Sequence, residues 1–213
     1  MISTTYTTGS DVMLRRGLRL AYFTIGWDVV EGVVAVAAGI IAGSIVLLGF
    51  GIDSAIEVFA ASVVVWQLRR PGSAGRQRAA LRLIAVTFCA LAAYVSFESV
   101  QRLVEGAHPE PSVIGIVMNL IALVVMIPLA RMKRRTGEAL GNDVLLADAA
   151  ETRLSNYLSV NVLAGLSLNA LLGWWWADPA AALVIAAYAA WTGWRTWREG
   201  GEGERRVVAE VRR

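Results

Sequence analysis

Six long apolar stretches divide this chain, and each is long enough to cross a lipid bilayer as a helix. A bilayer core of about 30 Å requires about 20 apolar helical residues. The stretches lie at residues 18–42, 44–68, 79–103, 112–131, 142–172 and 179–197. The composition agrees, because 56% of the residues are hydrophobic and only 17% are charged. We therefore predict an all-α integral membrane protein, a bundle of six transmembrane helices.

The polar ends of the chain flank this apolar part. Residues 1–17 are polar and precede a long apolar run without a small-residue cleavage site, so we expect no cleavable signal peptide. Residues 199–213 are charged and too few to fold alone. We predict a cytoplasmic N-terminal segment at 1–17, one transmembrane domain at 18–198, and a short charged cytoplasmic tail at 199–213.

Basic residues gather on one side of the predicted membrane. Eighteen of the 20 lie before the first stretch, in or beside the second and fourth connections, or around the end of the sixth; Arg102 and Arg153 are the exceptions. The positive-inside rule then places both termini in the cytoplasm. We expect a multi-pass protein of the plasma membrane, the inner membrane of a bacterium. Because these charges are scattered among connections, they indicate topology and no nucleic-acid partner.

Acidic residues also occur inside the predicted spans, where they are costly. An ionised carboxylate at a helix centre costs about 3 kcal/mol on the insertion scale. Only Arg153 lies comparably deep as a counter-charge. The seven acids are Asp28, Glu31, Asp53, Glu57, Glu98, Asp148 and Glu151. Their total cost indicates a function for them.

The spacing of these acids narrows that function. Asp53 and Glu57 are four residues apart, and Asp148, Glu151 and Ser155 follow at intervals of three and four, so each set shares one helical face. If the first, second and fifth spans meet, these faces form an oxygen-rich pocket. A divalent cation is its natural occupant. The alternative is that the acids bind neighbouring helices or Arg153 and serve packing alone.

Other polar residues have weaker patterns. Asp28 and Glu31 share a face of the first span, while Asp28 and Glu98 are interpreted as possible relay groups, with Glu98 also able to reach the external surface. His108 lies in a short proline-containing connection and is expected to be solvated. Asp178 precedes Pro179, which predicts a helix N-cap followed by proline at the first helical position.

Three segments resemble the cation diffusion facilitator family. They are residues 43–57, GSIVLLGFGIDSAIE, residues 146–159, LADAAETRLSNYLS, and residues 173–182, GWWWADPAAA. The resemblance covers residues 22–198. It implies a six-helix, usually dimeric, proton-coupled exporter of zinc, manganese, iron, cobalt or related ions. The chain is most similar to the short form of this family, without the usual C-terminal cytoplasmic domain.

The resemblance also implies a metal site with paired ligands four residues apart on the second and fifth helices. Asp53 and Glu57 match the first pair. In the second pair, Glu151 stands where the family has histidine, and Ser155 where it has aspartate. An all-oxygen site shifts the expected ion from zinc toward manganese, iron or magnesium. Asp148 or Glu31 would supply the missing negative charge.

We therefore expect a secondary transporter for divalent metal cations, working as a proton-coupled antiporter by alternating access. Its expected partners are the lipid bilayer, metal ions, protons and a second copy of the chain. No HExxH, Walker or GxGxxG pattern points to an enzyme. Two alternatives stay open: a membrane sensor that binds a metal ion without moving it, and a proton-coupled carrier of a small organic cation.

Overall fold

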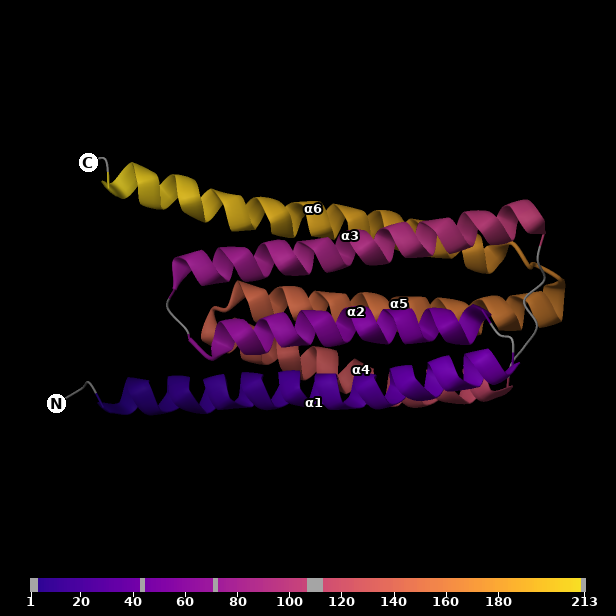
Figure 1. The fold of residues 1–213 in the computed structure, drawn as a ribbon, viewed down its shortest axis with the longest axis horizontal. Coiled ribbons are helices and arrows are strands. Elements are labelled where there is room, and N and C mark those ends of the chain that lie inside the picture. Colours follow the sequence, from indigo (N-terminus) through magenta and orange to yellow (C-terminus); the bar gives the residue numbers. More distant parts are fainter. Residues whose placement is uncertain (1–3, 43–44, 71–72, 107–112, 212–213) are drawn as a thin grey trace.

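The computed structural model describes residues 4–42, 45–70, 73–106 and 113–211, which form six α-helices (Figure 1). The helices are α1 (Thr4–Ala42), α2 (Ile45–Leu68), α3 (Ala74–Glu105), α4 (Val113–Leu140), α5 (Asp143–Leu172) and α6 (Ala177–Val211). They run side by side along the long axis of the molecule, and α1 begins at the same end where α6 finishes (Figure 1). The all-α prediction is confirmed.

Three pairings dominate the packing: α1 with α2, α3 with α6, and α4 with α5. The middle of the bundle is formed by α2 and α5, with α1 on one side and α3 and α6 on the other (Figure 1). Both α1 and α5 contact α2, and α5 also contacts α3, α4 and α6. The second and fifth helices, which carry the acid pairs, are therefore central.

Four helices are long and apolar enough to cross a membrane by length and composition. These segments are Ser10–Ile41, Leu47–Leu68, Ala74–Glu105 and Val113–Leu140. Their outer faces carry large exposed apolar side chains, among them Ile41, Val104 and Val124, as expected of a surface in contact with lipid. By contrast, α5 carries acids, hydroxyls and amides on its buried face, which lowers its overall hydropathy. The number of spans therefore stays a prediction at six.

The helices extend beyond the predicted spans because backbone hydrogen bonds do not require apolar side chains. The first begins at Thr4, well inside the segment assigned to 1–17, and the sixth continues through the charged residues to Val211. The difference matters most for α4, which continues to Leu140 although the predicted apolar span ended at residue 131. Its basic residues therefore belong to a helix and not to a loop.

Glycines bring two helix pairs into close contact. A Cβ added to Gly39 of α1 would lie 3.0 Å from Leu48 of α2. Likewise, a Cβ on Gly165 of α5 would meet Asp178 of α6, with the Asp178 Cα only 3.1 Å away. Neither position can hold a larger side chain without movement of the neighbouring helix.

Proline interrupts the hydrogen bonding of one helix. Pro128 lies inside α4, where it has no backbone N–H to donate to the carbonyl of Val124. The helix continues past it to Leu140.

Candidate metal-binding centre

The acid pair of α2 faces α5 at the centre of the bundle. Glu57 is buried and Asp53 is half-buried one turn away. Ser155 of α5 donates a hydrogen bond from Oγ to Oδ1 of Asp53, with 3.4 Å between the oxygens. The structure therefore brings together residues from the two sets that the sequence spacing defined.

Glu57 is buried and interacts with charged side chains from three other helices. Its side chain is 5% exposed, and its Oε1 atom has no hydrogen-bond partner in the described part of the chain. It interacts electrostatically with Lys133 of α4 and with Asp148 of α5, and it lies beside Asp28 of α1. Carboxylates from three helices therefore act on one another here.

The acids of α1 differ in their surroundings. Asp28 is 1% exposed, and within the described residues neither of its carboxylate oxygens has a hydrogen-bond partner. It interacts with Glu57 and Lys133. Glu31 is half-buried and accepts a hydrogen bond of 2.7 Å from the Trp27 indole nitrogen. Asp28, which had no clear partner in the sequence pattern, is thus part of the acidic interior.

The counter-charge in this interior is Lys133, and the sequence-based choice of Arg153 was wrong. Lys133 is completely buried, with its Nζ 2.9 Å from Oδ2 of Asp148. It also donates a hydrogen bond of 3.0 Å to Oγ1 of Thr152. Arg153 lies on the other side of α5, where it lines a cavity with α4.

Two sequence signals could have identified Lys133. It is the only lysine in a chain that otherwise uses arginine. It also continues the buried stripe of α4 at helical spacing, after Met126 and Leu129 and before Thr136. The positive-inside count hid this pattern, because it assigned every basic residue near residue 131 to a connection.

Glu151 lies one turn beyond Asp148 in α5 and is also buried. It is 1% exposed, and both of its carboxylate oxygens lack a hydrogen-bond partner among the described residues. The closest polar neighbour from another helix is Thr87 of α3. Electrostatic interactions connect Glu151 to Glu57, Asp148 and Lys133.

Taken together, six carboxylates from three helices share one interior, and four of them interact with the buried ammonium group of Lys133. The six are Asp28, Glu31, Asp53, Glu57, Asp148 and Glu151. In the described ranges, no three acidic, histidine or cysteine side chains lie close enough together to hold a metal ion. The six side chains therefore share one interior, but they do not converge on a common point.

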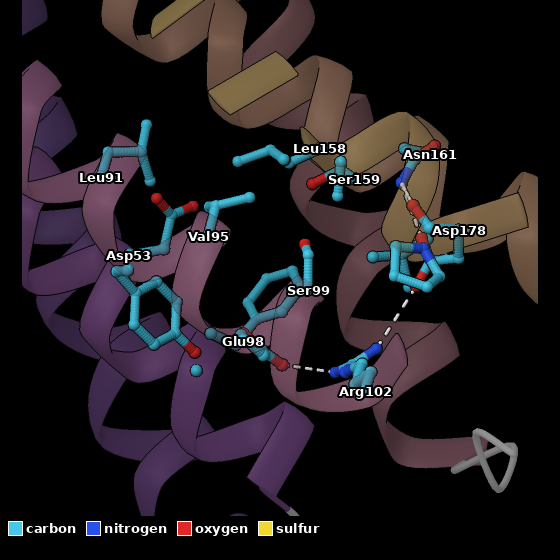
Figure 2. Close-up of a pocket in the computed structure, with 16 residues that line it drawn as sticks. Asp53, Leu91, Val95, Glu98, Ser99, Arg102, Leu158, Ser159, Asn161 and Asp178 are labelled. Carbon is cyan, nitrogen blue, oxygen red and sulfur yellow. Dashed lines mark hydrogen bonds and ion pairs between the residues drawn. The ribbon is translucent and has the colours of Figure 1, made fainter. Parts of the chain in front are cut away.

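A cavity of about 100 Å³ extends from Asp53 toward the connection between α5 and α6. Figure 2 shows the Asp53 carboxylate near Leu91 and Val95, with Arg102 at the opposite end. The wall between them includes Ser99 and Ser159. A space of this size is large enough for water molecules, and it borders one side of Asp53.

An ion-pair network lines the far end of this cavity. Arg102 of α3 pairs with Glu98 one turn earlier and with Oδ2 of Asp178 at 3.3 Å (Figure 2). Asn161 of α5 donates a hydrogen bond of 2.6 Å to Oδ1 of Asp178.

The N-cap interpretation of Asp178 is wrong, because α6 begins at Ala177 and Asp178 lies in its first turn. Glu98 points to Arg102 rather than outward. His108 lies outside the described residues.

The apolar outer faces, the long helices that lie side by side and the acidic interior define a multi-pass membrane protein with ionisable groups in its core. The chain belongs to the cation efflux family: the family model described as the cation efflux transmembrane domain matches residues 25–202. The family expected from the sequence motifs is thereby confirmed.

The chain is also similar to a named member of that family. It is 32% identical over 88 residues to the cation-efflux pump FieF of Shewanella oneidensis. The aligned part covers 41% of this chain and 29% of that protein's length.

Proposed function

We propose that this protein moves divalent metal cations across the membrane by exchange with protons. The main support is a group of buried carboxylate oxygens on Asp28, Glu57 and Glu151 that have no hydrogen-bond partner in the part of the chain that the structure describes. One ammonium, that of Lys133, faces all three of them. A lipid-embedded interior with this imbalance is stabilised when a mobile cation or protons enter it.

The donor chemistry favours a hard divalent ion as substrate. Asp53 and Glu57 of α2, with Glu151 and Ser155 of α5, offer only oxygen ligands, with Asp148 and Glu31 available to add charge. Carboxylate and hydroxyl oxygens suit manganese and magnesium, while zinc, cobalt and iron also accept carboxylates. The family membership supports a cation as cargo.

Proton exchange follows from the same ligands. A carboxylate must be deprotonated to bind a metal ion, so binding releases protons and proton return releases the ion. The cavity from Asp53 ends at the Arg102 network, which we propose closes this side while the ion enters from the other. The homodimer, the bacterial inner membrane and the cytoplasmic termini are parts of this proposal.

Flux measurements on reconstituted protein test it. The full chain is placed in liposomes that contain a pH-sensitive dye, and manganese or zinc is added outside. We expect metal-driven proton flux from the wild type and its loss from the double variant Asp53→Ala with Glu57→Ala. Flux that survives in this variant would refute the proposal.

The matched control removes two carboxylates from the surface. Glu138 and Glu199 form exposed pairs with Arg134 and Arg195, so the variant Glu138→Ala with Glu199→Ala should keep its flux. Calorimetry separates the alternative function. Metal binding to the wild type without any flux would identify a membrane sensor and exclude a transporter.

A further inference from the structure

A second cavity lies between α4 and α5, on the side of α5 that faces away from the acidic centre. Its volume is about 740 Å³. Three arginines line it, Arg131 and Arg134 from α4 and Arg153 from α5. Of the described residues in its wall, one is acidic, Glu138, and it already accepts a hydrogen bond of 2.8 Å from Arg134. The cavity is therefore positively charged.

Two of these guanidinium groups lack a protein counter-charge. Among the described residues, neither Arg131 nor Arg153 forms an ion pair with a carboxylate. The Nε of Arg153 is buried and has no hydrogen-bond partner in the described ranges. A buried charged donor without an acceptor is strongly unfavourable. An anion in the cavity would satisfy it.

The geometry of guanidinium groups favours a phosphate as that anion. A guanidinium presents parallel N–H donors that match two oxygens of a phosphate or carboxylate. Asn156 and Tyr157 add neutral polar groups to the same wall. The arginines come from both α4 and α5, so one headgroup would be held from both sides.

The position of the cavity points to a lipid rather than a soluble anion. Arg131 and Arg134 lie in the last turns of α4, at the end of the bundle where α1 begins and α6 finishes (Figure 1). Apolar side chains continue the wall from the arginines toward the middle of the helices, with Ile127 on α4 and exposed Val160 on α5. This order, charged at the interface and apolar toward the membrane centre, matches a phospholipid.

We propose that this cavity binds an anionic phospholipid, with its phosphate between Arg131 and Arg153 and an acyl chain along Ile127 and Val160. Basic pockets between transmembrane helices suit such headgroups. The site is separate from the metal centre, so it stands or falls independently of the proposed transport.

Native mass spectrometry of the full chain in detergent tests this assignment. Phosphatidylglycerol and phosphatidylcholine with the same acyl chains compete for the protein. We expect the wild type to retain phosphatidylglycerol preferentially. The double variant Arg131→Gln with Arg153→Gln should lose about thirty-fold in affinity for it, the effect of two interfacial cationic contacts. Wild-type affinity in that variant would overturn the proposal.

A charge-matched control addresses general attraction to the basic end of the bundle. The variant Arg15→Gln with Arg16→Gln removes two exposed arginines of α1 at that end and should keep the preference. An equal loss in this control would overturn the proposal, since it would show a diffuse effect. The single variant Arg131→Gln, at an exposed position, serves if the double variant does not fold, with a loss of about five-fold expected.

Inorganic phosphate distinguishes a headgroup from a free anion. The thermal unfolding midpoint of the wild type, followed by tryptophan fluorescence, should rise with phosphatidylglycerol and stay constant with millimolar sodium phosphate. A rise with phosphate alone that disappears in the Arg131→Gln and Arg153→Gln variant would assign the cavity to a soluble anion and overturn the lipid assignment.

Discussion

The two polar regions inside this bundle contain the same kinds of residue but differ in how well their charges are paired. In the first region, at the end of the cavity that begins at Asp53, Arg102 pairs with both Glu98 and Asp178, and Asn161 donates a hydrogen bond to Asp178. Near the middle, six carboxylates share an interior with one ammonium group, and several of their oxygens have no hydrogen-bond partner among the described residues. The first region is satisfied by the protein itself, and the second is not.

This difference separates a structural role from a functional one. In a paired network, attraction between the partners offsets at least part of the cost of removing the charges from water, and the loss of one partner leaves the other charge uncompensated. An unpaired acidic interior costs free energy as it stands, so a fold retains it when binding offsets that cost. Acids within a span are therefore informative only after their partners are known. Glu98 and Glu57 illustrate the two outcomes.

Removal of the buried ammonium group of Lys133 should have the largest effect on stability. Lys133→Met leaves Asp148 buried without a partner, and we expect a loss of about 3–5 kcal/mol in the free energy of unfolding. Lys133→Arg keeps the charge and should lose less. Thermal or denaturant unfolding in detergent measures both.

The matched control for that change is Arg195→Met, which breaks an exposed pair with Glu199. It should alter the free energy of unfolding by less than about 1 kcal/mol. Equal effects at the two positions would mean that the buried ammonium has no special role.

Loss of one unpaired acid should act on metal binding instead. For Glu57→Gln we expect about a 100-fold weaker affinity for manganese or zinc in calorimetry, the upper range found even for groups that only support a ligand. Glu138→Gln, an exposed acid of α4, should bind as the wild type does. An unchanged affinity in Glu57→Gln would place the metal elsewhere.

The paired network should show the opposite result. Arg102→Ala strands Glu98 and Asp178, and we expect about 2 kcal/mol lower stability, less than for a fully buried pair because Arg102 is partly exposed. Metal affinity should stay within about two-fold of the wild type. A large drop in affinity would show that the two regions are one functional unit.

The smallest expected effect on stability concerns the close packing of α5 against α6 at Asp178, a member of the Arg102 network. Gly165→Ala places a Cβ against Asp178 and should lower stability by about 1–2 kcal/mol. Gly75→Ala, where a Cβ meets nothing within 4 Å, should be neutral or slightly stabilising. Unfolding midpoints compare the two. Equal behaviour would show that α5 and α6 adjust freely around Asp178.

Helical periodicity and hydropathy predicted much of this molecule. The all-α class followed from apolar length, and the family from the motifs around Asp53 and Asp148. Spacing correctly placed Asp53 and Glu57 on a helical face near Ser155. Helix ends were less predictable, because α4 continues as a helix after its apolar residues finish.

The partners of the charges could not be predicted, because pairing depends on how helices pack. Lys133 and Arg153 exchanged their expected roles for this reason. Lys133 faces inward from a region that hydropathy assigned to a loop, while Arg153 faces away from the acids that precede it in α5. The direction that each side chain faces depends on how its helix is rotated in the bundle, which the sequence pattern alone did not determine.

The proline inside α4 has a consequence for the buried ammonium. A helix is easiest to bend where a backbone hydrogen bond is missing, and Pro128 leaves the Val124 carbonyl without its helical donor. Lys133 lies just over one turn beyond this point. Pro128 is therefore the point at which a bend in α4 would change the position of Lys133 relative to Asp148. A bend that withdraws Nζ from Asp148 would leave both helices folded.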